Sequence, residues 1–207
     1  MSFVKKWMGC IISFVAGVCG LALSACSGMV ASGMIDASAI NSAYSSTIPE
    51  NVTKAFKVLT DKELYTQAKS LNIGSEFMIM KVFAIITLII SVLLIAYAIV
   101  MLLKNLNVIK CESKIFDIVG LVLVGLFLIA VVGLFISSSC YANAMQDALI
   151  SSAKASYLNL GIPQAALPNI KFNINVELGA YQPIMLTVAI ITAIIVGTFA
   201  FINRKKA

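Results

Sequence analysis

The stretch WMGCIISFVAGVCGLALSACSGMVA, residues 7–31, decides how the rest of the chain is organised. It is apolar apart from its serines. A helix rises about 1.5 Å per residue, so the stretch is long enough to cross a hydrocarbon core of about 30 Å. We therefore predict that residues 7–32 form a first transmembrane helix, preceded by a short cytoplasmic N-terminus at residues 1–6.

Small residues recur at every fourth position of this predicted helix. Lipid chains are as apolar as leucine side chains, so membrane helices associate through close backbone approach, which small residues allow. We expect this face to pack on the protein's own helices, while packing on a neighbouring subunit and lining of a pore remain alternatives. The two rows are Gly9, Ser13 and Gly17, and Ala16, Gly20, Ser24, Gly28 and Ser32.

A competing interpretation starts from Leu23-Ser24-Ala25-Cys26, which follows Lys5-Lys6 and an apolar region. This tetrapeptide resembles the lipobox of bacterial lipoprotein signal peptides. The resemblance implies a lipid-anchored Cys26 as the first mature residue and removal of residues 1–25. Against it, the apolar, small-residue pattern continues through the cleavage position to Ile35. We predict a retained helix and keep the lipoprotein as an alternative.

The composition is that of a membrane protein. Hydrophobic residues make up 60% of the chain and charged residues 12%, and the mean hydropathy is +1.00, far from the balance of a soluble domain. Three more stretches are apolar and long enough to span a bilayer, at residues 77–103, 115–137 and 183–203. Four spans place both termini, including residues 204–207, on one side of the membrane.

Basic residues indicate which side that is. The side with both termini carries eight Lys or Arg and two acidic residues, whereas the other side carries seven of each. The whole net charge of +6 therefore lies on the terminal side. By the positive-inside rule both termini are cytoplasmic, and we expect a plasma-membrane protein. This surplus is explained by orientation and by anionic lipid headgroups, so we predict the lipid bilayer as a partner and no nucleic acid.

Two short amphipathic helices are predicted in the first outer loop, residues 33–76. The first follows Pro49 and aligns Val52, Phe56 and Leu59 on one face. The second opens at the capping box of residues 60–63, and Gly74 is expected to end it.

The spans at residues 77–103 and 115–137 are joined by a short basic turn at residues 104–114. We predict that they form an antiparallel helical hairpin. Gly125, Gly133 and Ser137 lie on one row of the second of these helices. That row is expected to offer a groove for the small face of the first helix.

The second outer loop, residues 138–182, begins as a continuation of the preceding helix that ends at Gly161. After two prolines, residues 170–178 alternate strictly between apolar and polar side chains, which predicts a β-strand. A lone strand needs a pairing partner. That partner is either the segment at residues 39–48 or a strand of another chain, and the third alternative is an extended segment that no strand covers. The apolar positions expected to lie on one face of this strand are Ile170, Phe172, Ile174, Val176 and Leu178.

No chemistry of a known type can be assigned. The chain has no histidine and carries no nucleotide-binding, nucleophile or metal-ligand motif, so we predict no catalytic residue, no metal and no cofactor. Among its five cysteines only Cys26 and Cys140 lie near the outer surface, and a disulfide between them fits an oxidising compartment. Ordinary buried thiols are the alternative.

Four spans, inward termini and two outer loops, the second with a strand, resemble the topology of claudins and related tetraspan families. The claudin tryptophan with paired cysteines is missing, because Trp7 is the only tryptophan, and we assign no family. We predict an all-α membrane protein, a four-helix bundle with a small outer cap of short helices and one strand. Its expected role is that of a structural or accessory subunit, as a homo-oligomer or with other membrane subunits.

Overall fold

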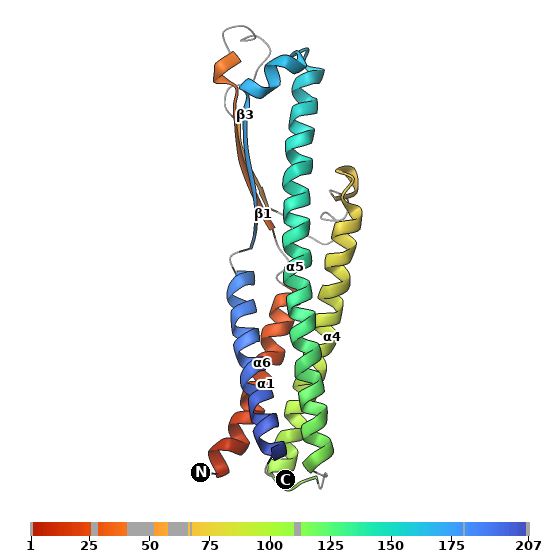
Figure 1. Cartoon of the computed structure of the whole chain (residues 1–207), viewed down its shortest axis with the longest axis vertical. Coiled ribbons are helices and arrows are strands. Elements are labelled where there is room, and N and C mark those ends of the chain that lie inside the picture. The colour runs from red at the N-terminus through yellow and green to blue at the C-terminus, as the bar shows by residue number, and fades with distance from the viewer. Residues whose placement is uncertain are drawn as a thin grey trace. The chain divides into compact units, whose positions relative to one another are not determined.

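A computed structural model describes residues 2–25, 29–40, 52–57, 66, 68–109, 113–179 and 181–205 (Figure 1). The fold is mostly helical, with one small sheet. It divides into two compact units, described separately below. Unit 1 contains residues 1–27, 80–137 and 180–207, and unit 2 contains residues 28–79 and 138–179. Two helices, α4 (Gly74–Asn105) and α5 (Ser113–Asn159), run continuously from one unit into the other.

Unit 1 is a bundle formed by α1 (Ser2–Ala25), α6 (Tyr181–Lys205) and the adjoining parts of α4 and α5. Three helical stretches are long and apolar enough to cross a membrane, at Trp7–Ala25, Gly74–Asn105 and Ile115–Asn159. In α6 the described apolar part, Gln182–Thr198, is shorter. The expected helices at residues 77–103 and 115–137 are therefore confirmed, and the fourth span remains a prediction.

Large apolar side chains point outward from all four helices of unit 1. Because exposed apolar surface of this extent is unfavourable in water, it fits contact with lipid chains. Side chains of this kind, each more than 40% exposed, include Ile11, Phe14, Ile85, Ile89, Val122, Ile129, Ile191 and Ile194.

The first helix is shorter than the sequence predicted. It ends at Ala25, and the chain continues into strand β1 (Met29–Asp36), so Ser32 lies in a strand and Gly28 lies outside the described residues. The prediction of a helix through residue 32 was wrong because this segment is apolar or small at nearly every position. Such a run fits both a buried helix and a half-buried strand, and pairing with other strands decided between them.

Unit 2 contains a three-stranded antiparallel sheet in the order β2-β1-β3, where β2 is Val52–Lys57 and β3 is Lys171–Leu178. The predicted strand at residues 170–178 is confirmed by β3. Within the described residues its partner is β1, with Met29 opposite Leu178 and Asp36 opposite Lys171 (Figure 1). Most of the first predicted partner, residues 39–48, lies outside the described residues, and pairing with a strand of another chain stays a prediction. The sheet was missed as a whole because β1 lies in the stretch that the sequence assigned to a membrane helix.

Most of the predicted short helices of the first outer loop are replaced or lie outside the described residues. Val52 and Phe56 belong to β2, so a helix there was wrong. Of the second predicted helix, residues 68–70 are helical, whereas residues 60–65 lie outside the described part. Gly74 begins α4 and does not end the helix before it. Asn72, at φ 61°, occupies the left-handed position that ends this turn.

The end of α5 is fixed by the same kind of backbone geometry. Gly161 has φ 86°, and its N–H donates to the carbonyl of Leu158 at 3.0 Å. The N–H of Ile162 donates to the carbonyl of Tyr157 at 3.3 Å. This pair of bonds is a Schellman motif, and it confirms the predicted helix end at Gly161.

A small core lies where α5 ends. Its members come from the end of α5, from the 3-10 helices η1 (Ser38–Ile40) and η2 (Gln164–Asn169), and from the residue that precedes β3. The ring of Phe172 packs edge-on against Tyr157, with ring centroids 5.8 Å apart, and thereby fixes β3 to α5. The buried residues of this core are Ala37, Ile40, Tyr157, Ile162 and Ile170.

Candidate functional site

The small-residue face of α1 is buried inside unit 1. Gly9, Ser13, Ala16, Gly17 and Gly20 are all buried, and Ser24 is partly buried. A methyl group added at Gly17 would lie 2.5 Å from Cγ1 of Ile95 in α4. One added at Gly20 would collide with the hydroxyl of Ser91 and lie 2.6 Å from Cε2 of Phe127 in α5. The face therefore supplies close packing within this chain.

Hydroxyl groups at this interface bond to their own helices. Ser13 Oγ donates to the carbonyl of Gly9 at 2.8 Å, Thr87 Oγ1 to Phe83 at 2.8 Å, and Ser91 Oγ to Thr87 at 2.6 Å. All three side chains have no exposed surface. Because a buried hydroxyl is costly unless it is bonded, back-bonding makes these serines and threonine compatible with an apolar interior. Within a single chain these three hydroxyls are thus shielded from solvent.

The predicted groove on α5 is not the surface that receives α1. An added methyl group at Gly125 would meet no atom within 4 Å, and one at Gly133 would collide with the ring of Phe83 in α4. Ser137 is buried and back-bonds to Leu134 at 3.0 Å. The predicted row does not form one continuous groove, because residues four apart on a helix of 3.6 residues per turn are rotated by about 40° relative to each other. Residues eight apart on such a row therefore face different neighbours.

α1 also packs along α6, and Cα atoms of the two helices lie within 8 Å of one another. α6 carries a small-residue row of its own at Ala189, Ala193 and Gly197, which the sequence analysis missed. Ala189 and Ala193 are buried to 0% and 1% exposure. Small residues at every fourth position, the pattern that identified the packing face of α1, could have identified this row as well.

The predicted antiparallel hairpin of α4 and α5 is confirmed by a stack of side chains that the sequence analysis also missed. The Tyr97 ring lies against Gly120, where an added methyl group would collide with it. On its other side Tyr97 stacks on Phe116, with ring centroids 4.6 Å apart and planes at 18°. Lys104 Nζ lies 5.0 Å above the Phe116 ring. This stack binds the ends of the two helices together beside the basic turn.

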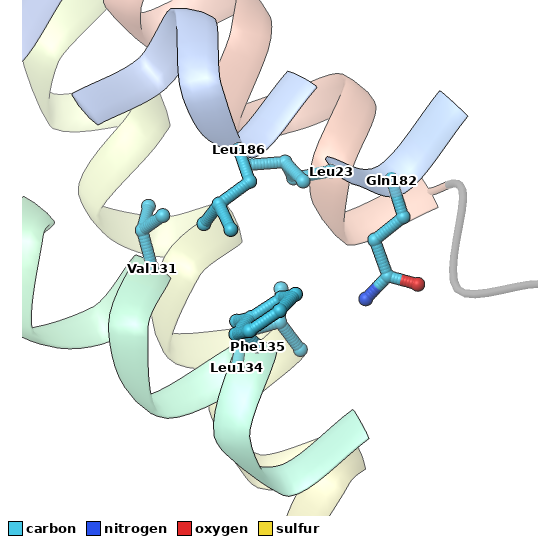
Figure 2. A pocket seen from close by; sticks show the side chains of 6 residues that line it. All are labelled: Leu23, Val131, Leu134, Phe135, Gln182 and Leu186. Atoms are coloured by element: carbon cyan, nitrogen blue, oxygen red, sulfur yellow. The ribbon is translucent and has the colours of Figure 1, made fainter. Parts of the chain in front are cut away.

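A narrow cavity, too small to hold a water molecule, lies in unit 1 between α1, α5 and α6 (Figure 2). It is lined by Leu23, Val131, Leu134, Phe135, Gln182 and Leu186. Its one polar side chain is Gln182, which is 2% exposed. The cavity is apolar and has no ionisable group among its lining residues, so it offers no acid, base or metal ligand.

Strand β3 of unit 2 has two chemically distinct faces. In β3 the side chains of Lys171, Asn173, Asn175 and Glu177 are exposed, whereas Phe172, Ile174 and Leu178 are half-buried and Val176 is buried. The predicted apolar face of the strand is thus confirmed for these four residues. Ile170 is buried but lies before β3, where it caps η2.

Asp36 and Lys171 form an opposite-charge pair across β1 and β3. The Ser38 N–H donates to Asp36 Oδ1 at 3.0 Å. Hydrogen bonds from Ser38 lower the pKa of the Asp36 carboxyl below its ordinary value, and the nearby Lys171 charge lowers it further. These contacts fasten the end of β1 to the start of β3.

Cysteines and acidic residues form no cluster able to hold a metal ion in the described part of the chain. Cys10 is buried and its Sγ donates to the carbonyl of Ala98 at 3.0 Å. Cys140 is an exposed free thiol. Cys26 lies outside the described residues, so its lipidation and its disulfide with Cys140 stay predictions.

Comparison with protein-family models found no match, and comparison with curated proteins found no matching sequence. The class of protein therefore rests on the fold itself. Three helices that can cross a membrane, with apolar side chains on their outer surface, are those of an integral membrane protein.

Proposed function

We propose that this protein is a structural or accessory subunit of a membrane assembly and has no catalytic role of its own. The observation that supports this role is the sheet of unit 2, which belongs to a different compact unit from the apolar bundle and in which β3 exposes a row of polar side chains. Its strands are fixed to α5 through Phe172, which also lies 5.8 Å below Lys154 Nζ. Because β3 is held against α5, its exposed side chains have fixed positions, and a binding surface on rigid elements is more precise than one on loops.

The proposed topology has four spans, with both termini cytoplasmic and the sheet on the outer side of the plasma membrane. Support comes from the basic residues, whose surplus lies wholly beside the termini and the turn at residues 104–114. The lipid bilayer is then a partner along the exposed apolar side chains of unit 1.

The pore alternative has less support. It requires the small face of α1 to meet water in an oligomer, yet Ser13, Ala16 and Gly20 are buried within a single chain. The lipoprotein alternative requires removal of residues 1–25, yet Gly17 and Gly20 pack closely on α4 and α5. Cleavage would leave those surfaces open. Intact mass spectrometry of the protein from its native membrane distinguishes these cases, because a mass that includes residues 1–25 rejects the lipoprotein.

The assembly role is tested by extraction from the native membrane in a gentle detergent, followed by native mass spectrometry. We expect particles heavier than one 22.1 kDa chain, either a homo-oligomer or a complex with other membrane proteins. A monodisperse monomer without a co-purifying protein, obtained across several mild detergents and lipid nanodiscs, would reject the role.

A further inference from the structure

β3 is an edge strand of the sheet in unit 2. β1 is its only pairing partner within the described residues, so the backbone groups on its other side face no described strand. Within the described residues this edge is unpaired over eight residues, and such an edge is a template for another strand. Phe172 is packed on Tyr157 and lies near Lys154, so the edge is held in place before any partner arrives.

The sequence around β3 is complementary to itself in the antiparallel direction. Residues 170–178 read IKFNINVEL, and Ile174 is the centre of this pattern. If two copies pair with Ile174 opposite Ile174, each Lys171 lies opposite a Glu177. Phe172 then lies opposite Val176, and Asn173 lies opposite Asn175. Every position therefore meets a residue of matching chemistry, including two opposite-charge pairs.

Other registers lose this match. A shift of one residue would place apolar positions opposite polar ones and turn the strand's faces, which the half-buried Phe172 and the exposed Asn173 forbid. Shifts that keep the faces aligned move Lys171 away from Glu177. The register centred on Ile174 is thus the one that satisfies both the pleat and the charges.

We propose that β3 pairs with β3 of a second copy of this chain, in the antiparallel register centred on Ile174. Two three-stranded sheets then become one continuous six-stranded sheet. This inference rests on the proposed assembly role and names the partner as the protein itself. The apolar side chains of both β3 strands then lie on one side of the shared sheet and their polar side chains on the other.

Chain connectivity gives the pair a direction. β1 begins shortly after α1 ends at Ala25, and β3 ends shortly before α6 begins at Tyr181. Both membrane helices are therefore joined to the same end of the sheet. An antiparallel pair places the chain ends that lead to the membrane helices of the two copies at opposite ends of the shared sheet.

Disulfide cross-linking of the full chain tests the register. In a background with all five native cysteines replaced by alanine, we expect Ile174→Cys to form a covalent dimer with itself under mild oxidation. Lys171→Cys alone and Glu177→Cys alone serve as matched controls, because each lies far from its own copy. Mixing the two variants should restore the dimer. Equal cross-linking by all three single variants, or none by Ile174→Cys and by the mixture, would overturn the register.

Charge reversal in the wild-type background gives a test that does not need the cysteine-free protein. Lys171→Glu and Glu177→Lys each set like charges opposite one another, and we expect each to weaken the dimer about tenfold. The double variant should recover it. If Lys171 acted only through Asp36 in its own chain, Glu177→Lys would have no effect and the double variant would stay as weak as Lys171→Glu.

A complex with other membrane proteins but no β3 cross-link would refute this inference and leave the assembly role standing, whereas a partnerless monomer would refute both.

Discussion

Gly20 is the residue at which the packing of α1 is tightest. An added methyl group would meet the Ser91 hydroxyl and the Phe127 ring, and both of these side chains have no exposed surface. Neither neighbour has space to move, so Gly20→Ala forces the helices apart. We expect it to destabilise the protein by about 1–3 kcal/mol, the usual cost of overpacking. The measurement is unfolding by SDS in mixed micelles, followed by circular dichroism.

Gly125→Ala is the matched control for this substitution. Gly125 lies in a membrane helix too, but its added methyl group would meet no atom within 4 Å. We expect no loss of stability, since alanine also favours a helix over glycine by about 0.5–1 kcal/mol. Equal losses in the two variants would show that α1 does not pack on α4 and α5 in this way.

Asp36 gives the sheet a dependence on pH. Its pKa is lowered in the folded state by the Ser38 hydrogen bonds and by Lys171. A lowered pKa means that the charged form is bound more tightly in the folded state, so its stabilising effect is complete above the ordinary value of 3.8. That effect is lost as the pH falls through the lower, folded-state pKa.

Asp36→Asn should therefore lower the unfolding midpoint near neutral pH. In strong acid the variant and the wild type should converge, because the wild-type carboxyl is then also neutral. Thermal unfolding of the full protein at both pH values measures this. A gap between the two proteins that stays constant across this pH range would mean that the carboxylate charge is not involved.

Among the elements, the C-terminal end of α5 depends on a single backbone angle. Gly161 has φ 86° and open space around it, so Gly161→Ala meets no clash and its cost is conformational. We expect a loss of about 1–2 kcal/mol. Gly74 also has open space but lies at the start of α4 without a positive φ, so Gly74→Ala should be neutral. Hydrogen exchange of the Ile162 amide reports local opening, and equal exchange in both variants would contradict the prediction.

The hairpin of α4 and α5 depends on the contact of Tyr97 with Gly120. We expect Gly120→Ala to lower stability by about 1–3 kcal/mol because the buried Tyr97 ring has to move. In a Tyr97→Leu background the same substitution should cost less, since the ring is gone. The four proteins form a double-mutant cycle. Additive costs would show that the two residues do not touch.

How far the sequence predicts each element depends on how many structures its pattern allows. The helices at residues 77–103 and 115–137 were predictable because a helix satisfies all backbone hydrogen bonds of a long apolar segment within the segment itself, as lipid requires. β3 was predictable because its alternation has period two. β1 was not, since Met29, Ala31, Gly33 and Ile35 read equally well as the end of an apolar helix. Its identity as a strand depends on pairing with β2 and β3, which are distant in the sequence.

The candidate contacts were predicted only in part for a similar reason. Intervals of four correctly marked the α1 face as a packing surface, yet they did not say which helix it meets. Gly20 meets Ser91 and Phe127, two residues that no spacing rule singles out. Side-chain size on the opposite helix determines the fit, and that information lies elsewhere in the chain.

At the scale of the whole molecule, the small-residue packing surfaces lie in unit 1, whereas the surface that we propose for partner contact lies in unit 2. Small residues of α1 and α6 are buried within unit 1, so the bundle needs no second copy to cover them. The edge of β3 that faces no other described strand, and the polar side chains exposed along it, are the surfaces that we propose for contact with a partner. Association through this edge would require no repacking of the helices of unit 1.

The orientation of the whole molecule follows from its charges and can be measured directly. Val108, 67% exposed, lies in the basic turn, and Leu160, 46% exposed, lies at the end of α5. Basic residues are retained on the cytoplasmic side, so the turn at residues 104–114 should be inside and the end of α5 outside. In a cysteine-free background, a membrane-impermeant maleimide should label Leu160→Cys on intact cells. It should label Val108→Cys only after permeabilisation. The reverse pattern would invert the topology, and labelling of both on intact cells would mean that α4 and α5 do not both cross the membrane.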